Sequence, residues 1–270
     1  FKYSPCLKVP NVQVIFEKEK WGLDEDYIPE NANKKYGGEF TLTQGLAKSK
    51  NTVSAYLMKR VKPRKVINLA RKMGIKSYLP AVPSLCLGTA EVSLFEMAGA
   101  YATFANEGLY IEPSFVSRIE DKNGVVLESF SESPIEVLSA EKNYIMVNLL
   151  QGVVNQGSGG RLRWYYNFKN EIAGKTGTTQ NHSDGWFIGF VPELVTAIWT
   201  GADNRAVRFR DLHLGQGAEM ALPIWGEYMQ KIYADPLIDV STRDFPFPEG
   251  GVSVLLDCNQ SNLINNDEEF

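Results

Sequence analysis

Apolar residues recur at helical spacing through much of the first half of the chain. Positions three and four residues apart share one face of a helix, so this spacing is typical of amphipathic helices. Local signals mark some helix ends: Ser139 is suited to cap the start of one helix, and Gly74 to end another. We therefore expect helices over residues 41–61, 63–73, 93–106, 139–154 and 220–233, the last interrupted near Pro223.

In two other parts of the chain, apolar and polar residues alternate, which is typical of β-strands. In the first, residues 109–131, the turn residues Lys122-Asn123-Gly124 predict a hairpin. The second contains three strand-like runs, over residues 171–175, 185–191 and 194–201. Helices followed by strands and a final helix predict one α+β domain.

The two ends of the chain differ from its middle. Residues 1–40 contain Pro5, Pro10 and Pro29 and no long periodic run, so we expect an irregular segment. Residues 41–235 form the expected core of the domain. After residue 235 the composition changes to Pro-, Gly- and Asn-rich sequence, which predicts a C-terminal tail over residues 236–270, outside the main core.

Composition narrows the possible classes of protein. The chain has 270 residues, 44% hydrophobic, with a formal net charge of -4, so disorder is excluded and a nucleic-acid partner is disfavoured. The chain has three scattered cysteines, Cys6, Cys86 and Cys258, and only two histidines, His182 and His213. Because a zinc site needs three or four closely spaced ligands, this composition predicts no metal site. Three cysteines allow at most one internal disulfide, and its pairing stays open. No apolar run of about 18 residues is present.

The strongest chemical signal is the run Gly174–Thr179, GKTGTT, at the end of an expected strand. The ammonium of Lys175 and the hydroxyls of Thr176 and Thr178 can hold a substrate carboxylate, and Gly177 leaves room for another backbone to approach. A Gly/Thr-rich turn is the simpler alternative for so short a motif. A phosphate-binding P-loop is excluded because the first glycine of its pattern is absent.

A second signal is Ser49-Lys50-Asn51, at a helix start or in a turn between two helices. A serine and an asparagine two residues apart usually form a cap or a turn, and alone they indicate nothing more. Their order relative to the other motif changes this interpretation, because SxN upstream of KTG belongs to the serine-nucleophile set of penicillin-binding proteins and β-lactamases.

The wider sequence resembles the transpeptidase domain of bifunctional class A penicillin-binding proteins. FTLTQGLAKSKNTVSAYLMKRV is similar to that family's SxN region, and SLCLGTAEVSLFEMAGAYATFANEGLYIEP to its next helix and hairpin. VVNQGSGGRLR, IAGKTGTTQNHSDGWFIGFVPELVTAIWTGAD and ALPIWGEYM resemble its sheet core and last helix. The similarity runs in consistent order from about Pro5 to Asp235.

This resemblance implies the α+β fold of penicillin-binding proteins and serine β-lactamases, an antiparallel sheet flanked by helices. It also implies a peptidoglycan D,D-transpeptidase, which acylates a serine with the stem peptide at D-Ala-D-Ala and transfers the acyl group to a neighbouring amine. No cofactor or metal is implied. Stem peptides would be the substrates, β-lactams the inhibitors, and an upstream glycosyltransferase domain and membrane anchor the neighbours, on the periplasmic side of the cytoplasmic membrane.

The same resemblance implies a role for each motif residue. Ser49 would relay a proton toward the leaving group, and Asn51 would orient the substrate amide. Lys175 would supply positive potential, while the hydroxyls of Thr176 and Thr178 bind the terminal carboxylate. The N–H of Thr178 would form half of the oxyanion hole.

One motif of the family is not found in its expected place. In the family, the nucleophilic serine lies in an SxxK motif upstream of SxN. In this chain, no serine ahead of Ser49 stands three residues before a lysine. We therefore expect the nucleophilic serine upstream of residue 1. Two alternatives stay open: a D,D-carboxypeptidase or β-lactamase-like hydrolase, and a non-catalytic domain that binds stem peptides or acts as a scaffold.

Overall fold

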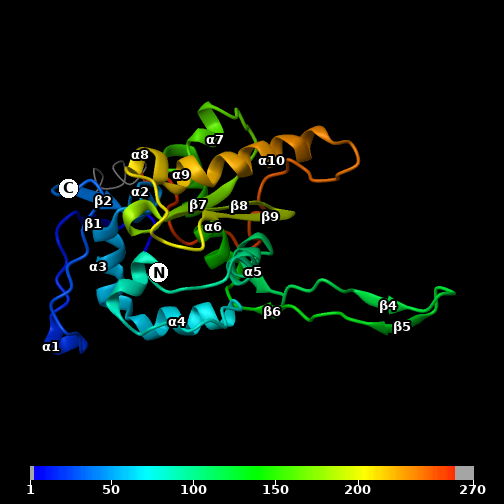
Figure 1. Cartoon of the computed structure of the whole chain (residues 1–270), viewed down its shortest axis with the longest axis horizontal. Helices are drawn as coiled ribbons and strands as arrows, with labels where there is room; N and C mark the ends of the chain where they lie inside the picture. Colours follow the sequence, from blue (N-terminus) through cyan, green and yellow to red (C-terminus); the bar gives the residue numbers. More distant parts are fainter. Residues whose placement is uncertain (1–2, 259–270) are drawn as a thin grey trace, which may run out of the picture.

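An antiparallel sheet of three strands in the order β7–β8–β9 lies between two groups of helices (Figure 1). The structure is a computed structural model and describes residues 3–258. The strands are β1 (Lys8–Pro10), β2 (Glu39–Thr41), β3 (Leu109–Tyr110), β4 (Arg118–Glu120), β5 (Val126–Ser129), β6 (Ile135–Glu136), β7 (Ala173–Thr178), β8 (Asp184–Val191) and β9 (Leu194–Gly201).

Helices precede, interrupt and follow these strands, as expected for an α+β domain. The α-helices are α1 (Lys18–Trp21), α2 (Leu42–Ala47), α3 (Asn51–Val61), α4 (Pro63–Lys72), α5 (Leu94–Ala105), α6 (Ala140–Gln156), α7 (Arg161–Trp164), α8 (Leu212–Gly215), α9 (Gly217–Met220) and α10 (Leu222–Ala234). Two short 3₁₀ helices are η1 (Pro83–Leu87) and η2 (Gln180–His182).

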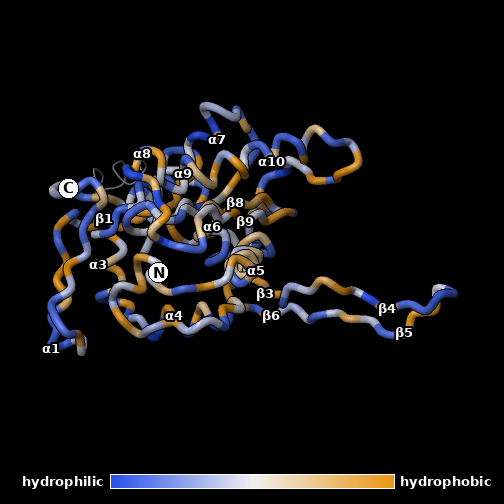
Figure 2. The backbone as a smooth tube through the Cα atoms, viewed as in Figure 1, coloured by the Kyte–Doolittle hydropathy of each residue, from blue (hydrophilic) through white to orange (hydrophobic). Residues whose placement is uncertain are grey.

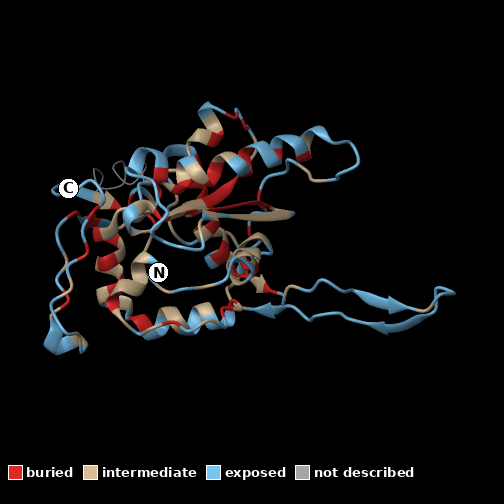
Figure 3. Cartoon of the chain, in the orientation of Figure 1, coloured by how far each residue is buried: buried red, intermediate tan, exposed pale blue. Residues whose placement is uncertain are grey.

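Successive residues of β8 enter two apolar cores on opposite faces of the sheet. On one face, Phe187 and Val191 belong to a buried cluster with Trp225 of α10. On the other face, Phe190 belongs to a cluster with Val147 of α6. Because both faces are covered, β8 is buried along most of its length (Figure 3), which explains its nearly continuous apolar sequence.

Four of the five expected helices form close to their expected bounds, and the last is interrupted before Pro223 as predicted. A capping box begins α5: the N–H of Glu96 donates to the Ser93 hydroxyl, and the Glu96 carboxylate accepts from the N–H of Ser93. Ser139 lies at the N-cap of α6, but its hydroxyl makes no capping hydrogen bond.

The helical pattern over residues 41–61 forms two helices and not one, because the chain breaks between α2 and α3, at the turn that is one of the two expected settings of Ser49-Lys50-Asn51. At the break, Ser49 has a φ of 51°, in the left-handed region that interrupts a helix. The carbonyl of Ala47, which a continuous helix would pair with the N–H of Asn51, instead accepts from the N–H of Ser158 at 3.0 Å. A tertiary contact therefore holds the break.

The predicted hairpin forms a long arm that projects from the body, with β4 and β5 at its far end (Figure 1). Its turn is held by Asp121, whose Oδ1 accepts from the N–H groups of Asn123 at 2.8 Å and Val125 at 2.9 Å. Hydrophobic and hydrophilic positions are mixed along the arm (Figure 2), and several apolar side chains are exposed, among them Phe115 at 88%.

The C-terminal segment packs on the domain as far as residue 258, so the expectation of a tail outside the core is wrong for residues 236–258. Phe245 is only 6% exposed and joins the α6-side cluster of β8. Its N–H donates to Glu171 at 2.9 Å, and the N–H of Ser253 donates to Glu141 at 2.6 Å. Residues 259–270 lie outside the described residues.

A disulfide joins Cys6 to Cys258, with the Cα atoms 5.1 Å apart, and Cys86 is a free thiol. The disulfide attaches the C-terminal segment to the N-terminal one, which is mostly irregular, as expected, apart from its three short elements. Within residues 3–258, no helix is both long and apolar enough to span a bilayer.

Candidate active site

The side chains of Ser49 and Lys175 meet although 126 positions separate them in the sequence. Lys175 lies within β7, and Ser49 lies in the break between α2 and α3. The Nζ of Lys175 donates to the Oγ of Ser49 at 3.1 Å. This contact brings the serine of the SxN motif and the lysine of the KTG motif together in the fold.

Lys175 carries an ammonium with no carboxylate partner among the described side chains. Its Nζ has a second acceptor, the carbonyl of Thr176 at 2.9 Å. Loss of water on burial lowers the pKa of Lys175 to about 8, because burial disfavours the charged form. The site therefore holds an uncompensated positive charge that can exchange its proton near neutral pH.

Asn51 is close to Ser49 along the chain, at the first residue of α3, but its side-chain amide has a different partner. Its Nδ2 donates to the carbonyl of Glu30 at 2.6 Å. Next to it, the buried hydroxyl of Thr52 donates to the Oδ1 of Asn11 at 2.8 Å. These contacts bind the irregular N-terminal segment to the start of α3. The structure shows no hydrogen bond between Asn51 and Lys175 within the described residues.

Thr176 is joined to a residue that sequence reasoning missed. The Oγ atoms of Thr176 and Ser158 lie 2.6 Å apart, in a hydrogen bond that either hydroxyl can donate. Ser158 belongs to the glycine-rich loop between α6 and α7. The only sequence signal was a serine among glycines in QGSGG, a composition equally typical of a plain turn.

Thr178 ends β7 and is exposed, and its hydroxyl contacts α9. The N–H of Gly217 donates to the Oγ1 of Thr178 at 3.0 Å. Because this bond uses the hydroxyl only as an acceptor, the hydroxyl proton of Thr178 stays free to donate to a ligand. Gly177, beside it, pairs with Trp186 of β8 and is half-buried.

The outer edge of β7 is open among the described strands, because β7 pairs only with β8. The motif residues Lys175–Thr178 lie on this strand, with Ser49 in contact with its lysine. An unpaired strand edge can bind an extended peptide through backbone hydrogen bonds. The arrangement therefore combines an unpaired strand edge, a positive charge and several hydroxyl groups.

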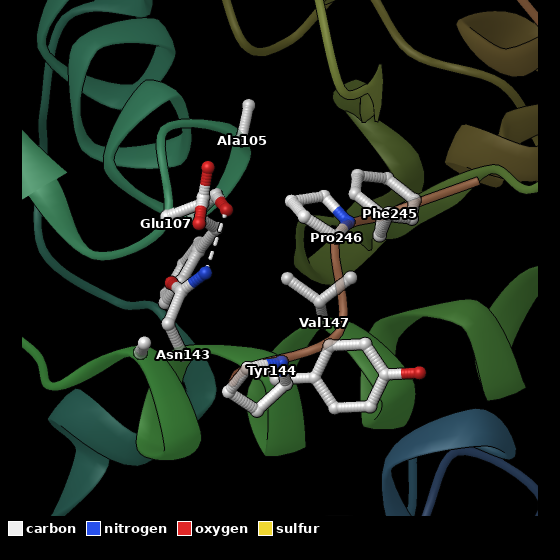
Figure 4. A pocket seen from close by; sticks show the side chains of 10 residues that line it. Ala105, Glu107, Asn143, Tyr144, Val147, Phe245 and Pro246 are labelled. Atoms are coloured by element: carbon white, nitrogen blue, oxygen red, sulfur yellow. Dashed lines mark hydrogen bonds between the residues drawn. The ribbon is translucent and has the colours of Figure 1, made fainter. Parts of the chain in front are cut away.

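The cavity shown in Figure 4 is not part of this arrangement. It lies between the end of α5, the start of α6 and the C-terminal segment at Phe245 and Pro246, and its volume is about 10 Å³. Asn143 lines it with a buried Oδ1 that has no hydrogen-bond partner. The volume is enough for about one water molecule. Among residues 3–258, no three His, Cys, Asp or Glu side chains are grouped to hold a metal ion.

Comparison with known proteins agrees with these observations. The family model described as "Penicillin binding protein transpeptidase domain" matches residues 8–204. A curated relative, penicillin-binding protein 1A of Aquifex aeolicus, is 35% identical over 247 residues, which are 90% of this chain and 32% of the relative. The chain thus spans about a third of the length of that relative.

Solved structures confirm the expected fold. Penicillin-binding protein 1A of Haemophilus influenzae matches with a TM-score of 0.79 and 23% identity, over 92% of this chain and 41% of that one. The PonA1 protein of Mycobacterium tuberculosis, solved in complex with penicillin V, matches with a TM-score of 0.72 and 24% identity, over 91% and 67% of the two chains. With the family match over residues 8–204, the chain belongs to the family of penicillin-binding protein transpeptidase domains.

Proposed function

We propose that this chain is the D,D-transpeptidase domain of a longer, class A penicillin-binding protein that cross-links peptidoglycan stem peptides. The observation that carries the proposal is the contact between Lys175 Nζ and Ser49 Oγ at the open edge of β7. A peptide that ends in a carboxylate needs a strand edge, a positive charge and hydroxyl donors in one place. These three requirements meet at this contact.

In the proposed reaction, a serine oxygen attacks the carbonyl carbon of the penultimate D-Ala and forms an ester. The bond to the terminal D-Ala nitrogen breaks, and that nitrogen takes the proton that the serine has lost. Ser49 relays this proton toward the leaving amine, a role supported by its contact with Lys175. An amine of a neighbouring stem peptide then attacks the ester, which completes the cross-link and frees the serine.

The remaining motif residues bind the substrate. The hydroxyls of Thr176 and Thr178, on one face of β7, donate to the terminal carboxylate, and Lys175 supplies positive potential. The N–H of Thr178 forms half of the oxyanion hole. Asn51 orients the substrate amide through its Oδ1, while the bond from its Nδ2 to Glu30 holds the side chain in place.

The nucleophile belongs, in this proposal, to an SxxK upstream of residue 1. Ser139-Ala140-Glu141-Lys142 also matches the SxxK pattern, but it follows Ser49 in the chain and lies at the start of α6. Lys142 is exposed, and no hydrogen bond between described residues joins Ser139 or Lys142 to Lys175. We therefore assign no role in acylation to this SxxK match at residues 139–142.

The proposal includes the setting of the whole protein: an upstream glycosyltransferase domain, a membrane anchor, and a location on the periplasmic side of the cytoplasmic membrane. The Cys6–Cys258 disulfide supports that location, because disulfides persist mainly in oxidising compartments such as the periplasm. β-Lactams would act as inhibitors that mimic D-Ala-D-Ala.

The test uses the full-length protein, a labelled penicillin, and a stem peptide with an acceptor amine. We expect covalent labelling that survives denaturation, release of D-Ala, and a cross-linked product detected by mass spectrometry. Lys175→Ala should slow labelling by about 10²-fold or more, since it removes the positive charge of the site. Lys169→Ala, which removes an exposed lysine before β7, should leave the rate unchanged.

The outcomes separate the alternatives. Release of D-Ala without a cross-linked product would indicate a carboxypeptidase or β-lactamase-like hydrolase. Binding of stem peptide with neither labelling nor release would indicate a non-catalytic binding domain and overturn the proposal.

A further inference from the structure

Ser158 makes two contacts that connect the two motif-bearing parts of the site. Its Oγ lies 2.6 Å from the Oγ1 of Thr176, the residue that follows Lys175 on β7. Its backbone N–H donates to the carbonyl of Ala47 at 3.0 Å, two residues before Ser49. A single residue of the loop after α6 therefore contacts both the KTG strand and the end of the helix that leads to Ser49.

The position of this loop depends on its backbone and not on the Ser158 side chain. The N–H groups of Gly157 and Gly159 both donate to the carbonyl of Val153, at 3.1 and 3.0 Å. A Cβ at residue 157 would lie 2.2 Å from the carbonyl oxygen of Ala47, so only glycine allows this close approach to α2. Removal of the Ser158 hydroxyl leaves all of these contacts in place.

The direction of the bond between the two hydroxyls matters for binding. Each hydroxyl has one proton, so Thr176 cannot donate to Ser158 and to a ligand at once. A carboxylate accepts hydrogen bonds and donates none. When Thr176 donates its proton to a substrate carboxylate, Ser158 must therefore be the donor in the 2.6 Å bond.

We infer that Ser158 is a positioning residue that, as donor to Thr176, directs the Thr176 hydroxyl proton toward the terminal carboxylate of the substrate. This inference rests on the proposed function and deepens it, because it assigns part of the recognition of a free C-terminal carboxylate to a residue outside the SxN and KTG motifs. A chain of two hydroxyls ending on a carboxylate also polarises each bond in the chain, which strengthens the terminal one.

The test compares two substrates of the full-length protein, an N-acylated D-Ala-D-Ala peptide and the same peptide with a C-terminal amide. A neutral hydrogen bond typically contributes a factor of about 2 to 12 in an equilibrium or rate. We expect Ser158→Ala to lower kcat/KM for the free acid by about 3- to 10-fold and to change that for the amide by less than about 2-fold. The preference for the acid over the amide should fall accordingly.

Three further variants make the result specific. Ser158→Thr keeps a hydroxyl and should restore the preference for the acid. Thr176→Ala removes the group through which Ser158 acts, so adding Ser158→Ala to it should cause no further loss of preference. Ser133→Ala, at an exposed serine on the arm, should leave both substrates unaffected.

Each result decides between possibilities. An equal loss for acid and amide in Ser158→Ala would assign Ser158 a structural role only and overturn the inference, as would an unchanged ratio. If the unmodified protein releases no D-Ala from the free acid, the proposed function fails, and the inference fails with it. If Ser158→Ala does not fold, the ratio measured with Ser158→Cys, which replaces the hydroxyl by a weak donor, decides in the same way.

Discussion

Lys175 is subject to two opposing requirements. Burial lowers its pKa to about 8, whereas the binding of a carboxylate favours its charged form. The contacts with Ser49 and with the Thr176 carbonyl hold the ammonium at the edge of β7. A lysine with an ordinary pKa would stay charged throughout the physiological range, so burial makes this site sensitive to pH.

We expect acylation to weaken as the pH rises through about 8, because the protonated fraction of Lys175 falls there. The measurement is the second-order rate of acylation of the full-length protein by a labelled penicillin between pH 6 and pH 10. Lys175→Arg should be slower overall but should keep its rate above pH 8, since a guanidinium stays charged. The same alkaline decline in Lys175→Arg would show that another group causes it.

Thr178 has two groups with proposed roles in substrate binding, its side-chain hydroxyl and its backbone N–H. Substitution can separate the effects of the two. Thr178→Ala removes the hydroxyl and keeps the N–H, so acylation should slow by about 10- to 150-fold, the usual effect of losing a hydrogen bond to a charged group. Thr178→Ser keeps both groups and should stay close to the unmodified rate. Equal rates for Thr178→Ala and the unmodified protein would exclude the carboxylate role.

At the scale of elements, the break between α2 and α3 presents Ser49 to Lys175. A continuous helix would place the Ser49 side chain on a helical surface, whereas the φ of 51° ends α2 before it and starts α3 after it. A residue other than glycine in this region costs about 1–2 kcal/mol. The position of Ser49 is therefore held at some expense of stability.

Two substitutions at Ser49 separate backbone strain from chemistry. Both Ser49→Gly and Ser49→Ala remove the hydroxyl, so both should lose most acylation. Ser49→Gly should have a free energy of unfolding about 1 kcal/mol higher than Ser49→Ala, because glycine adopts a positive φ without strain. Urea denaturation monitored by tryptophan fluorescence measures the difference. Equal stability of the two variants would contradict the strain at this position.

Elements whose ends depend on neighbouring residues could be predicted from the sequence. The helix start expected at residue 93 and the hairpin turn expected at Gly124 both depend on residues within a few positions of each other, in the first case through the capping box of Ser93 with Glu96. A turn between helices at Ser49 agrees with the sequence, but the contact that holds it could not be predicted, because the Ala47 carbonyl finds its partner in Ser158, far along the chain. Phe245 was misplaced for the same reason, since a Pro-rich composition does not reveal which apolar side chain enters a core.

In the site, too, the motif residues could be predicted from the sequence, whereas the partners of their side chains could not. Ser49 and Lys175 could be singled out because their motifs resemble a known set, and the fold brings their side chains into contact. Nothing local indicated that the Asn51 amide would bind the carbonyl of Glu30, or that Gly217 would donate to Thr178. Such partners come from elements that meet only in the folded chain.

At the scale of the whole molecule, the arm and the disulfide have a joint consequence. Lys122 lies exposed in the turn of the arm, and Cys6 and Cys258 lie on either side of it in the sequence. We expect limited digestion with a lysine-specific protease to cut first after Lys122. Electrophoresis should then show one band without reductant and two bands with it.

Lys122→Gln should slow this first cut, and Cys258→Ser should let the two pieces separate without reductant. Separation of the pieces of the unmodified protein in the absence of reductant would show that the Cys6–Cys258 bond has not formed.

The same bond determines how the domain carries mechanical load. A force applied to the chain before Cys6 and after Cys258 passes through the sulfur–sulfur bond, so the residues between them bear none of the tension. After reduction, the 252 positions that separate the two cysteines could extend to roughly 850 Å of chain. While the bond is intact, that length is inaccessible to stretching, and the contact between Ser49 and Lys175 is shielded from any pull on the ends.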